Sequence, residues 1–204
     1  MTWLYLLQMF GTAVFAASGV LAFRRERLDA FGALMLGLVT ALGGGTARDT
    51  ILNAPVFWIE DVNYVWAAVA AALAAFFFRR ILRRTHELLL YLDAAGVALF
   101  AVVALEKVLT LQFSATVAVI MGVLTSIGGG LTRDVLAGRP TLLMSREIYA
   151  TPVLLGCILY VLVQGLIPNF AELLALIVIF GVRAMAIHWH LEMPQWLTRD
   201  GMQD

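Results

Sequence analysis

Two stretches of the chain place charged and hydroxyl side chains directly after three consecutive glycines. The first reads GGGTARD from Gly43 to Asp49, and the second reads GGGLTRD from Gly128 to Asp134. Both lie in apolar segments, where ionised groups are disfavoured and where each glycine weakens a helix by about 1 kcal/mol relative to alanine. Ionisable groups beside interrupted helices, in apolar surroundings, are typical of a pathway for ions or small polar solutes across a membrane.

The same stretches do not favour catalysis. A phosphate-binding Walker loop needs a lysine after its last glycine and a strand before its first, and neither is found here. No set of His, Ser and Asp residues has the order of a catalytic constellation. His188 and His190 are spaced too closely to indicate a metal site and are more typical of a membrane-interface belt. We therefore expect neither enzyme activity nor a metal centre.

The composition is that of a membrane protein. Hydrophobic residues make up 62% of the 204 residues and charged residues 14%, with a mean hydropathy of +0.90, whereas soluble domains average about 45–50% and about 25%. The net charge of zero gives no basis for a nucleic-acid partner. The single cysteine, Cys157, excludes an internal disulfide.

Apolar runs bounded by charges, proline and glycine predict seven transmembrane helices in a single domain over residues 1–204. The first run lacks the positive start of a signal peptide, so we expect it to be retained. The predicted spans are Trp3–Phe23, Asp29–Leu52, Val62–Phe78, Glu87–Lys107, Phe113–Ala137, Ile148–Ile167 and Phe170–Ile187.

Arginines predict the orientation. They follow the first span (Arg24 to Arg27), the third (Arg79 to Arg84) and the fifth (Arg139 and Arg146), whereas the loops after the second and sixth spans lack them. Cytoplasmic loops carry the excess of Lys and Arg. We therefore expect the N-terminus outside and the C-terminus in the cytoplasm.

The chain repeats itself without gaps at an offset of 85 residues. Gly11 aligns with Gly96, Phe15 with Phe100, Gly37 with Gly122, Thr40 with Thr125 and Tyr64 with Tyr149. The two three-helix halves cover about residues 3–78 and 87–167, and the seventh helix covers about 170–187. Because three is odd, the second half must be inverted relative to the first. The predicted fold is all-α, with two inverted three-helix repeats plus a seventh helix.

The glycine triplets predict that the second and fifth helices are broken near the middle of the membrane and line a pathway, because unpaired backbone groups are tolerated only inside protein or beside water. The alternative is that the glycines allow close helix packing. Hydroxyls nearby could bind cations, although Ser and Thr also bond to their own helix. The candidate pathway residues are Gly43, Gly44, Gly45, Thr46, Gly128, Gly129, Gly130, Thr132, Thr40, Thr125 and Ser126.

Charged residues supply a second set of candidates. We expect Arg48 to pair with Asp134, and Arg133 with Asp49, across the pseudo-twofold axis, because adjacent residues of one helix point about 100° apart. Such pairs could clamp the two halves together or tune the field of a pore. Lys107 follows Glu106 at the end of the fourth span, as an interfacial pair or as a gate. Asp93 should face the protein interior.

The doubled GGG-x-x-RD motif followed by proline, on two three-helix halves plus a seventh helix, resembles the prokaryotic trimeric intracellular cation (TRIC) channel family. The resemblance covers nearly the whole chain. It implies a homotrimer in the cytoplasmic membrane, with one pore per protomer that passes monovalent cations, chiefly K⁺. It implies membrane lipids as partners and no cofactor besides permeant K⁺ or Na⁺ in the pore. Animal members carry a Lys-Glu-Val element, whereas this chain has Glu106, Lys107 and Val108, so their lipid gating is not carried over.

Two functions remain open on the sequence. The first is the cation channel. The second is a secondary transporter for a small amino acid such as glycine, because the same family has also been labelled a glycine transporter. In that case Arg48 or Arg133 would assist in holding a substrate carboxylate. A membrane scaffold would explain neither the glycine triplets nor the buried charges.

Overall fold

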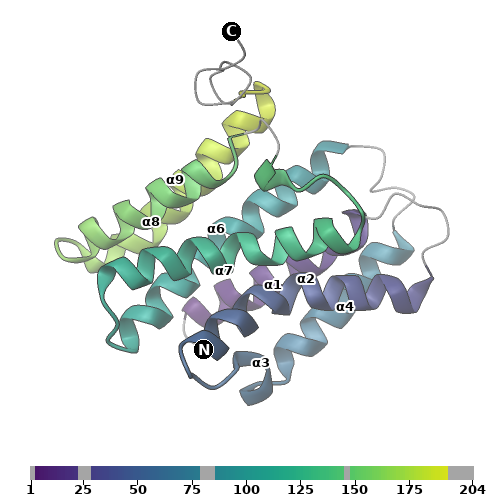
Figure 1. Cartoon of the computed structure of the whole chain (residues 1–204), viewed down its shortest axis with the longest axis horizontal. Coiled ribbons are helices and arrows are strands. Elements are labelled where there is room, and N and C mark those ends of the chain that lie inside the picture. Colours follow the sequence, from purple (N-terminus) through teal and green to yellow (C-terminus); the bar gives the residue numbers. More distant parts are fainter. Residues whose placement is uncertain (1–2, 23–28, 79–85, 145–147, 193–204) are drawn as a thin grey trace, which may run out of the picture.

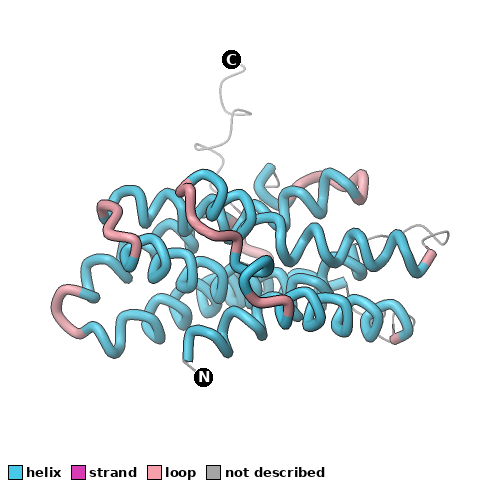
Figure 2. Tube along the Cα trace, turned by 90° about the horizontal axis from the view of Figure 1, so that it is seen from below, coloured by secondary structure: helices cyan, strands magenta, loops and turns pink. Residues whose placement is uncertain are grey.

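A computed structural model describes residues 3–22, 29–78, 86–144 and 148–192, and this part of the chain is almost entirely helical (Figure 2). Each of the seven predicted spans corresponds to one of the longer helices. The elements are α1 (Trp3–Ala22), α2 (Ala30–Ile51), α3 (Phe57–Glu60), α4 (Asn63–Phe77), α6 (His86–Thr110), α7 (Ala115–Leu136), the 3₁₀ turn η1 (Leu142–Met144), α8 (Ala150–Gln164) and α9 (Pro168–His188).

Five of these helices, α1, α2, α6, α7 and α9, are long and apolar enough to span a membrane. The other two, α4 and α8, have 15 residues each, or about 22 Å of helix, against a hydrocarbon core of about 30 Å. Both are the third helix of their half, and each follows a short element, α3 or η1. The two halves therefore share the same pattern of long and short helices.

The helices α2 and α7 begin in the same way. The Asp29 side chain accepts a hydrogen bond from the Gly32 amide at 2.7 Å, and the Ser114 hydroxyl accepts one from the Val117 amide at 3.4 Å. Asp29 and Ser114 are 85 residues apart, the offset of the repeat. Both are good N-cap residues, because a short side-chain oxygen satisfies an amide that has no partner within the helix. The repeat thus fixes the starts of both helices.

The two halves pack against each other in opposite directions. Leu7 of α1 clusters with Leu99 and Val103 of α6, whereas Leu21, further along α1, clusters with Leu89, earlier on α6. The contact is therefore antiparallel. Equivalent helices of the two halves meet in this way when the halves are related by an axis in the membrane plane. The predicted inverted arrangement is thus found in the structure.

The helices α2 and α7 also meet, and they run side by side across the middle of the molecule, with α8 and α9 together at its left edge (Figure 1). A Cβ on Gly44 would collide with the backbone oxygen of Thr125, and one on Gly129 would collide with that of Thr40. These two contacts are equivalents of each other at the repeat offset. The glycines allow the backbones of the two helices to touch.

The prediction that these helices are broken at the glycines is wrong. Helix α2 continues through Gly43 to Gly45, and α7 continues through Gly128 to Gly130. The helix persists because a broken turn inside the membrane would leave backbone groups without partners. The interpretation of the glycines as packing residues is the one that holds.

Three glycines occur in a row because each faces a different neighbour. Gly44 faces the backbone of α7, and a Cβ on Gly45 would lie 2.6 Å from the ring of Phe57. Gly43 faces open space, since a Cβ at this position would have no neighbouring atom within 4 Å among the described residues.

The second triplet follows the same plan with different neighbours. Gly129 faces the backbone of α2, and a Cβ on Gly130 would lie 3.0 Å from both Asp93 Oδ1 and Tyr149 Oη. At Gly128 the nearest atom to such a Cβ is the Cα of Gly44, at 3.7 Å. In each half the second glycine therefore makes the helix crossing, and the third leaves room for a side chain of a neighbouring segment.

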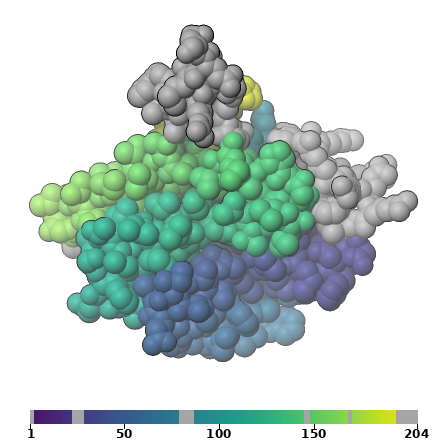
Figure 3. All heavy atoms as spheres, viewed as in Figure 1, coloured from purple at the N-terminus to yellow at the C-terminus, as the bar shows by residue number. Residues whose placement is uncertain are grey.

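Large apolar side chains cover much of the outer surface. On the face seen in Figure 3, α7 lies between α2 and the pair α8–α9. In water this surface would be strongly unfavourable, at about 25 cal/mol per Å² of apolar area, so it belongs in lipid or against another subunit. The exposed apolar residues on these helices include Phe31, Met35, Val39, Ile120, Leu124, Leu154, Leu155, Ile158, Leu162, Leu173 and Ile177.

Candidate functional site

The first buried charged group, which we call the Arg48 cluster, lies where α2 ends. Arg48 Nε donates to Asp49 Oδ1 at 2.7 Å, and Lys107 Nζ of α6 lies 2.9 Å from the same oxygen. The other carboxylate oxygen, Oδ2, accepts a hydrogen bond from the Phe57 amide at 3.0 Å. Arg48 and Asp49 are buried, and the Lys107 side chain is 25% exposed. We define the cluster as Arg48, Asp49 and Lys107.

The second group, the Arg133 cluster, lies where α7 ends. Arg133 Nε donates to Asp134 Oδ1 at 2.9 Å, and Arg133 Nη1 donates to Asp93 Oδ1 at 2.7 Å. Asp134 Oδ2 accepts from the Leu142 amide at 3.2 Å, and Arg183 Nη2 lies 3.8 Å from Asp93 Oδ2. We define the cluster as Asp93, Arg133, Asp134 and Arg183, all of which are buried.

The predicted pairing across the halves is wrong, because each arginine pairs with the aspartate that follows it in the same helix. Arg48 bonds to Asp49 and Arg133 bonds to Asp134. Adjacent Cβ atoms do point about 100° apart on a helix, but the long arginine side chain can fold back to bring its Nε to a short neighbouring carboxylate. The separation of the Cβ directions was therefore not enough to exclude the pair.

Each aspartate also fixes the next short element. Asp49 accepts from the first amide of α3, and Asp134 accepts from the first amide of η1, in both cases eight residues further along. A carboxylate at such an N-terminus satisfies an amide that has no helical partner and is favoured by the local dipole. The Arg-Asp pair is thus a structural unit that joins a long helix to the segment after it.

Asp93 faces the interior, as predicted, and bonds to Arg133. Lys107 pairs with Asp49 rather than with its neighbour Glu106, which instead accepts a hydrogen bond from Tyr160. Arg183 was missed by the sequence analysis. It lies in the last apolar run, and a charged residue inside a predicted span is itself a signal of this kind of role. Its guanidinium lies 4.6 Å from the centroid of the Tyr149 ring.

The hydroxyl candidates mostly bond to their own helices. Thr40 donates to Leu36 at 2.6 Å, and the others do the same to a carbonyl three or four residues earlier. Thr125 Oγ1 is buried and has no hydrogen-bond partner within the described ranges. Their oxygen lone pairs remain available to accept, although Thr46 also accepts from Trp58 Nε1 at 2.9 Å. The hydroxyls that donate to their own helix are Thr40, Thr46, Ser126 and Thr132.

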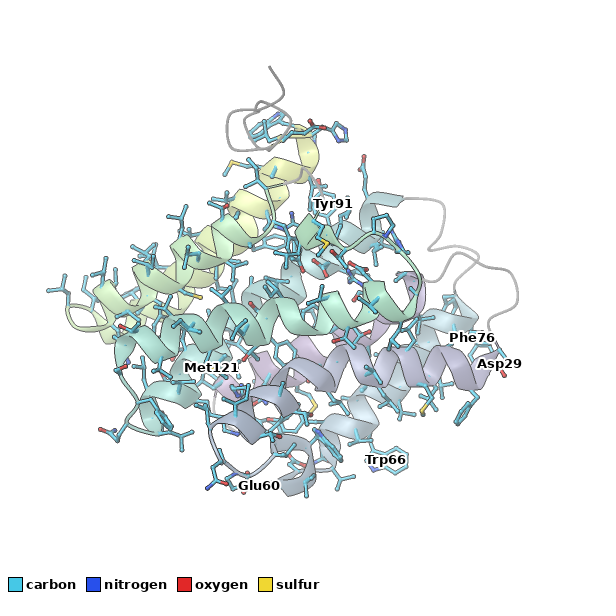
Figure 4. All side chains as sticks on the ribbon, viewed as in Figure 1. Asp29, Glu60, Trp66, Phe76, Tyr91 and Met121 are labelled. Carbon is cyan, nitrogen blue, oxygen red and sulfur yellow. The ribbon has the colours of Figure 1, made fainter. Side chains whose placement is uncertain are left out.

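A cavity of about 470 Å³ lies beside the Arg48 cluster, among α1, α3, α4 and α6. Gln8, Tyr64 and Lys107 contribute polar groups to its wall. Glu60, another wall residue, lies at the edge of the molecule beside α3, and Tyr91 lies at the opposite edge (Figure 4). Through Lys107, the cavity wall is connected directly to the buried carboxylate of Asp49. The structure thus brings a polar cavity to one buried charged cluster.

Comparison with known proteins identifies relatives along nearly the whole chain. A family model described as "Glycine transporter" matches residues 5–80 and again residues 90–165, one match in each half. A UPF0126 membrane protein of Vibrio cholerae is 45% identical over 195 residues, which is 94% of this chain and 82% of that protein. The UPF0126 inner membrane protein YadS of Escherichia coli is 40% identical and covers 93% of this chain and 94% of its own length.

Solved structures show the same fold. The TRIC trimeric intracellular cation channel orthologue from Rhodobacter sphaeroides superposes with a TM-score of 0.89 at 38% identity, over 94% of this chain and 100% of that chain. A prokaryotic TRIC channel in 0.5 M KCl gives a TM-score of 0.86 at 26% identity, over 93% and 98%. These relatives are channels or transporters rather than enzymes. The chain is therefore an integral membrane protein of the prokaryotic TRIC family, the family whose sequence model is called Glycine transporter.

Proposed function

We propose that this protein is a homotrimeric channel for monovalent cations, chiefly K⁺, with one pathway between the two halves of each protomer. The observation that carries the proposal is the likeness, at a TM-score of 0.89 and 38% identity, to a protein described as a trimeric intracellular cation channel. The inverted halves, which meet at α2 and α7, supply the kind of interface at which such pathways are found.

The pathway, in this proposal, passes the α2–α7 crossing on the side of Gly43 and Gly128. The reason is steric, because Gly44 and Gly129 hold the two backbones in contact, whereas a Cβ at Gly43 would meet no described atom within 4 Å. The wall on this side contains backbone and small side chains. The other lining residues proposed are Gly45, Thr46, Gly130, Thr132, Thr40, Thr125 and Ser126, with Arg48, Asp49, Arg133, Asp134 and Lys107 setting the field.

The proposed orientation places the N-terminus outside and the C-terminus in the cytoplasm, in the inner membrane of a prokaryote. It is supported by the positive-inside rule and by the E. coli relative, whose name describes an inner membrane protein. The arginines of segments 24–27 and 79–84, and Arg146, lie outside the described residues. Arg139 is described, and its Nη1 donates to the Ala22 carbonyl at 3.1 Å.

The alternative function is secondary transport of a small amino acid such as glycine. Two observations favour it as a second candidate, namely the description of the family model and the polar cavity beside the buried arginine of the first half.

Recording from purified protein in a planar bilayer tests the proposal. We expect unitary currents whose reversal potential in a KCl gradient lies near that of K⁺, and smaller currents when Na⁺ replaces K⁺. A protein without unitary currents that catalyses saturable uptake of labelled glycine into proteoliposomes would contradict the channel and support the carrier.

A further inference from the structure

Several buried hydrogen-bond donors near the cavity have no partner among the described residues. Arg48 is 1% exposed, and its Nη1 and Nη2 atoms make no hydrogen bond within the described ranges of the chain. The same is true of Gln8 Nε2. A buried donor without an acceptor is disfavoured, and a buried guanidinium especially so. These donors indicate that an acceptor group belongs beside them.

The other half of the molecule shows which kind of acceptor this is. At the repeat offset of 85 residues, Gln8 is the equivalent of Asp93, and Arg48 is the equivalent of Arg133. In the Arg133 cluster, Asp93 Oδ1 accepts from Arg133 Nη1 at 2.7 Å. In the Arg48 cluster an amide stands where that carboxylate would be, and Arg48 Nη1 is left without a partner in the part of the chain that the structure describes. The group that is lacking in the first half is a carboxylate.

The charges of the two clusters agree with this comparison. The Arg133 cluster combines two arginines with two aspartates, so its charges balance. The Arg48 cluster combines Arg48 and Lys107 with the single carboxylate of Asp49. An excess charge in a buried site is unfavourable unless a counter-charge accompanies it. One additional negative charge would balance the Arg48 cluster.

The cavity of about 470 Å³ brings a ligand to this place. Its wall includes Gln8, Tyr64 and Lys107, and the Tyr64 hydroxyl donates to Gln8 Oε1 at 3.2 Å. Arg48 lies within electrostatic reach of Tyr64. The volume is within the range of small-molecule sites, about 300–1,000 Å³. The buried donors and the cavity therefore occupy the same region of the first half.

The cavity also contains acidic groups away from the arginine. Glu60 and Asp61, at the end of α3, and Glu106 of α6 line the same space. An ammonium group is attracted by such carboxylates, so the two ends of a small amino acid would each meet groups of opposite charge. A simple carboxylate would satisfy the arginine and leave the acidic groups without a partner.

We propose that this cavity is a binding site for a small zwitterionic amino acid of the size of glycine, whose carboxylate bonds to Arg48 and Gln8 in the place that Asp93 holds in the other half. Its ammonium group faces Glu60, Asp61 and Glu106. The proposal goes beyond cation conduction, which requires no such ligand, and it is tested by binding rather than by current. Failure of one proposal is therefore distinguishable from failure of the other.

Thermal unfolding of the purified full chain in detergent measures the binding. Glycine should raise the midpoint of unfolding in a saturable way, because a ligand of the folded state stabilises it. Acetate should raise it less, and methylamine should not raise it. KCl at equal ionic strength is the control for a general anion effect. An equal shift from KCl, or no shift with any carboxylate, would overturn the proposal.

Variants of Gln8 place the ligand at this site. Gln8→Glu supplies the lacking carboxylate from the protein itself, so we expect a higher midpoint without ligand and loss of the glycine shift. Gln112→Glu makes the same change at an exposed loop residue and should keep the shift. Gln8→Leu removes the amide donor and should move the glycine titration to higher concentration. An unchanged glycine shift in both Gln8 variants would contradict the site.

Discussion

Phe15 stacks on Phe100, its own equivalent in the other half of the chain. The ring centroids are 5.2 Å apart, and the ring planes are 20° from parallel. Glycines make room for both rings, since a Cβ on Gly96 would press on Phe15 and one on Gly11 would press on Phe100. Because Gly11 and Gly96 are equivalents as well, the pseudo-twofold axis passes between the two rings. The pair is a contact of the interface that holds the halves together.

Replacing either ring with alanine should therefore have a similar effect. We expect Phe15→Ala and Phe100→Ala each to lower the free energy of unfolding by about 3–5 kcal/mol, the usual result for a buried phenylalanine. The double variant should lose less than the sum, by about 0.5–1.5 kcal/mol of pair energy. Denaturant titration in detergent measures all four states. Strict additivity would indicate that the rings contribute only through separate contacts.

Neighbouring glycines of the first triplet should respond in opposite ways to alanine. Gly44→Ala places a Cβ against the Thr125 backbone and should lower the unfolding midpoint, because the helix backbones must separate. Gly43→Ala meets open space and should be neutral or stabilising, by up to about 1 kcal/mol from helix propensity. Thermal unfolding of the two proteins compares them directly. Equal midpoints would contradict the backbone contact at the crossing.

Larger side chains on the open side of the crossing should reduce current without unfolding the protein. In Gly43→Leu and Gly128→Leu the new side chain enters the proposed pathway, so we expect a lower unitary conductance with an intact trimer. Current and gel-filtration profile are measured on the same preparation. Full conductance in a folded Gly43→Leu, Gly128→Leu double variant would remove the pathway from this side.

Double-mutant cycles distinguish the observed pairing from the pairing across the halves. Arg48→Gln and Asp49→Asn should be strongly non-additive in unfolding free energy, because the two residues share a hydrogen bond at 2.7 Å. Arg48→Gln and Asp134→Asn should be additive within about 0.5 kcal/mol, as is usual for residues without contact. Coupling of Arg48 to Asp134 above that value would revive the clamp between the halves.

Cysteine labelling in intact cells tests the orientation. Single cysteines in segments 24–27 and 79–84 should react only from the cytoplasm, and one at Asn63 only from outside, because the arginine-rich loops are retained inside. The native Cys157 is buried and serves as the unreactive background. Labelling of Asn63 and the arginine segments from the same side would contradict the inverted topology.

The elements of the fold were predictable because their signals are local and repeated. The seven apolar runs give the long helices to within a few residues, and the 85-residue offset alone gives the inversion of the halves. The sequence could not predict the length of α4 or α8, because the apolar runs continue beyond the helical segments.

The chemistry at the glycines was harder to predict, because it depends on contacts between distant segments. A triplet that looks unfavourable for one helix is favourable when Gly44 meets the backbone at Thr125, and no local property of the triplet shows this contact. The Arg-Asp pairs were misassigned because side-chain length was neglected. Gln8 was not recognised because an amide in an apolar run attracts no notice until its equivalent, Asp93, is seen to bond to an arginine.

The difference between Gln8 and Asp93 has a consequence for the ancestry of the chain. A protein consisting of one half, which associated with a second copy about the same axis, would carry the same residue at both of these positions, because a single gene encodes both copies. Fusion of two duplicated halves removes that constraint, so one position can be a carboxylate and the other an amide. An unequal pair of charged clusters is therefore available to a fused chain and not to a symmetric dimer of halves.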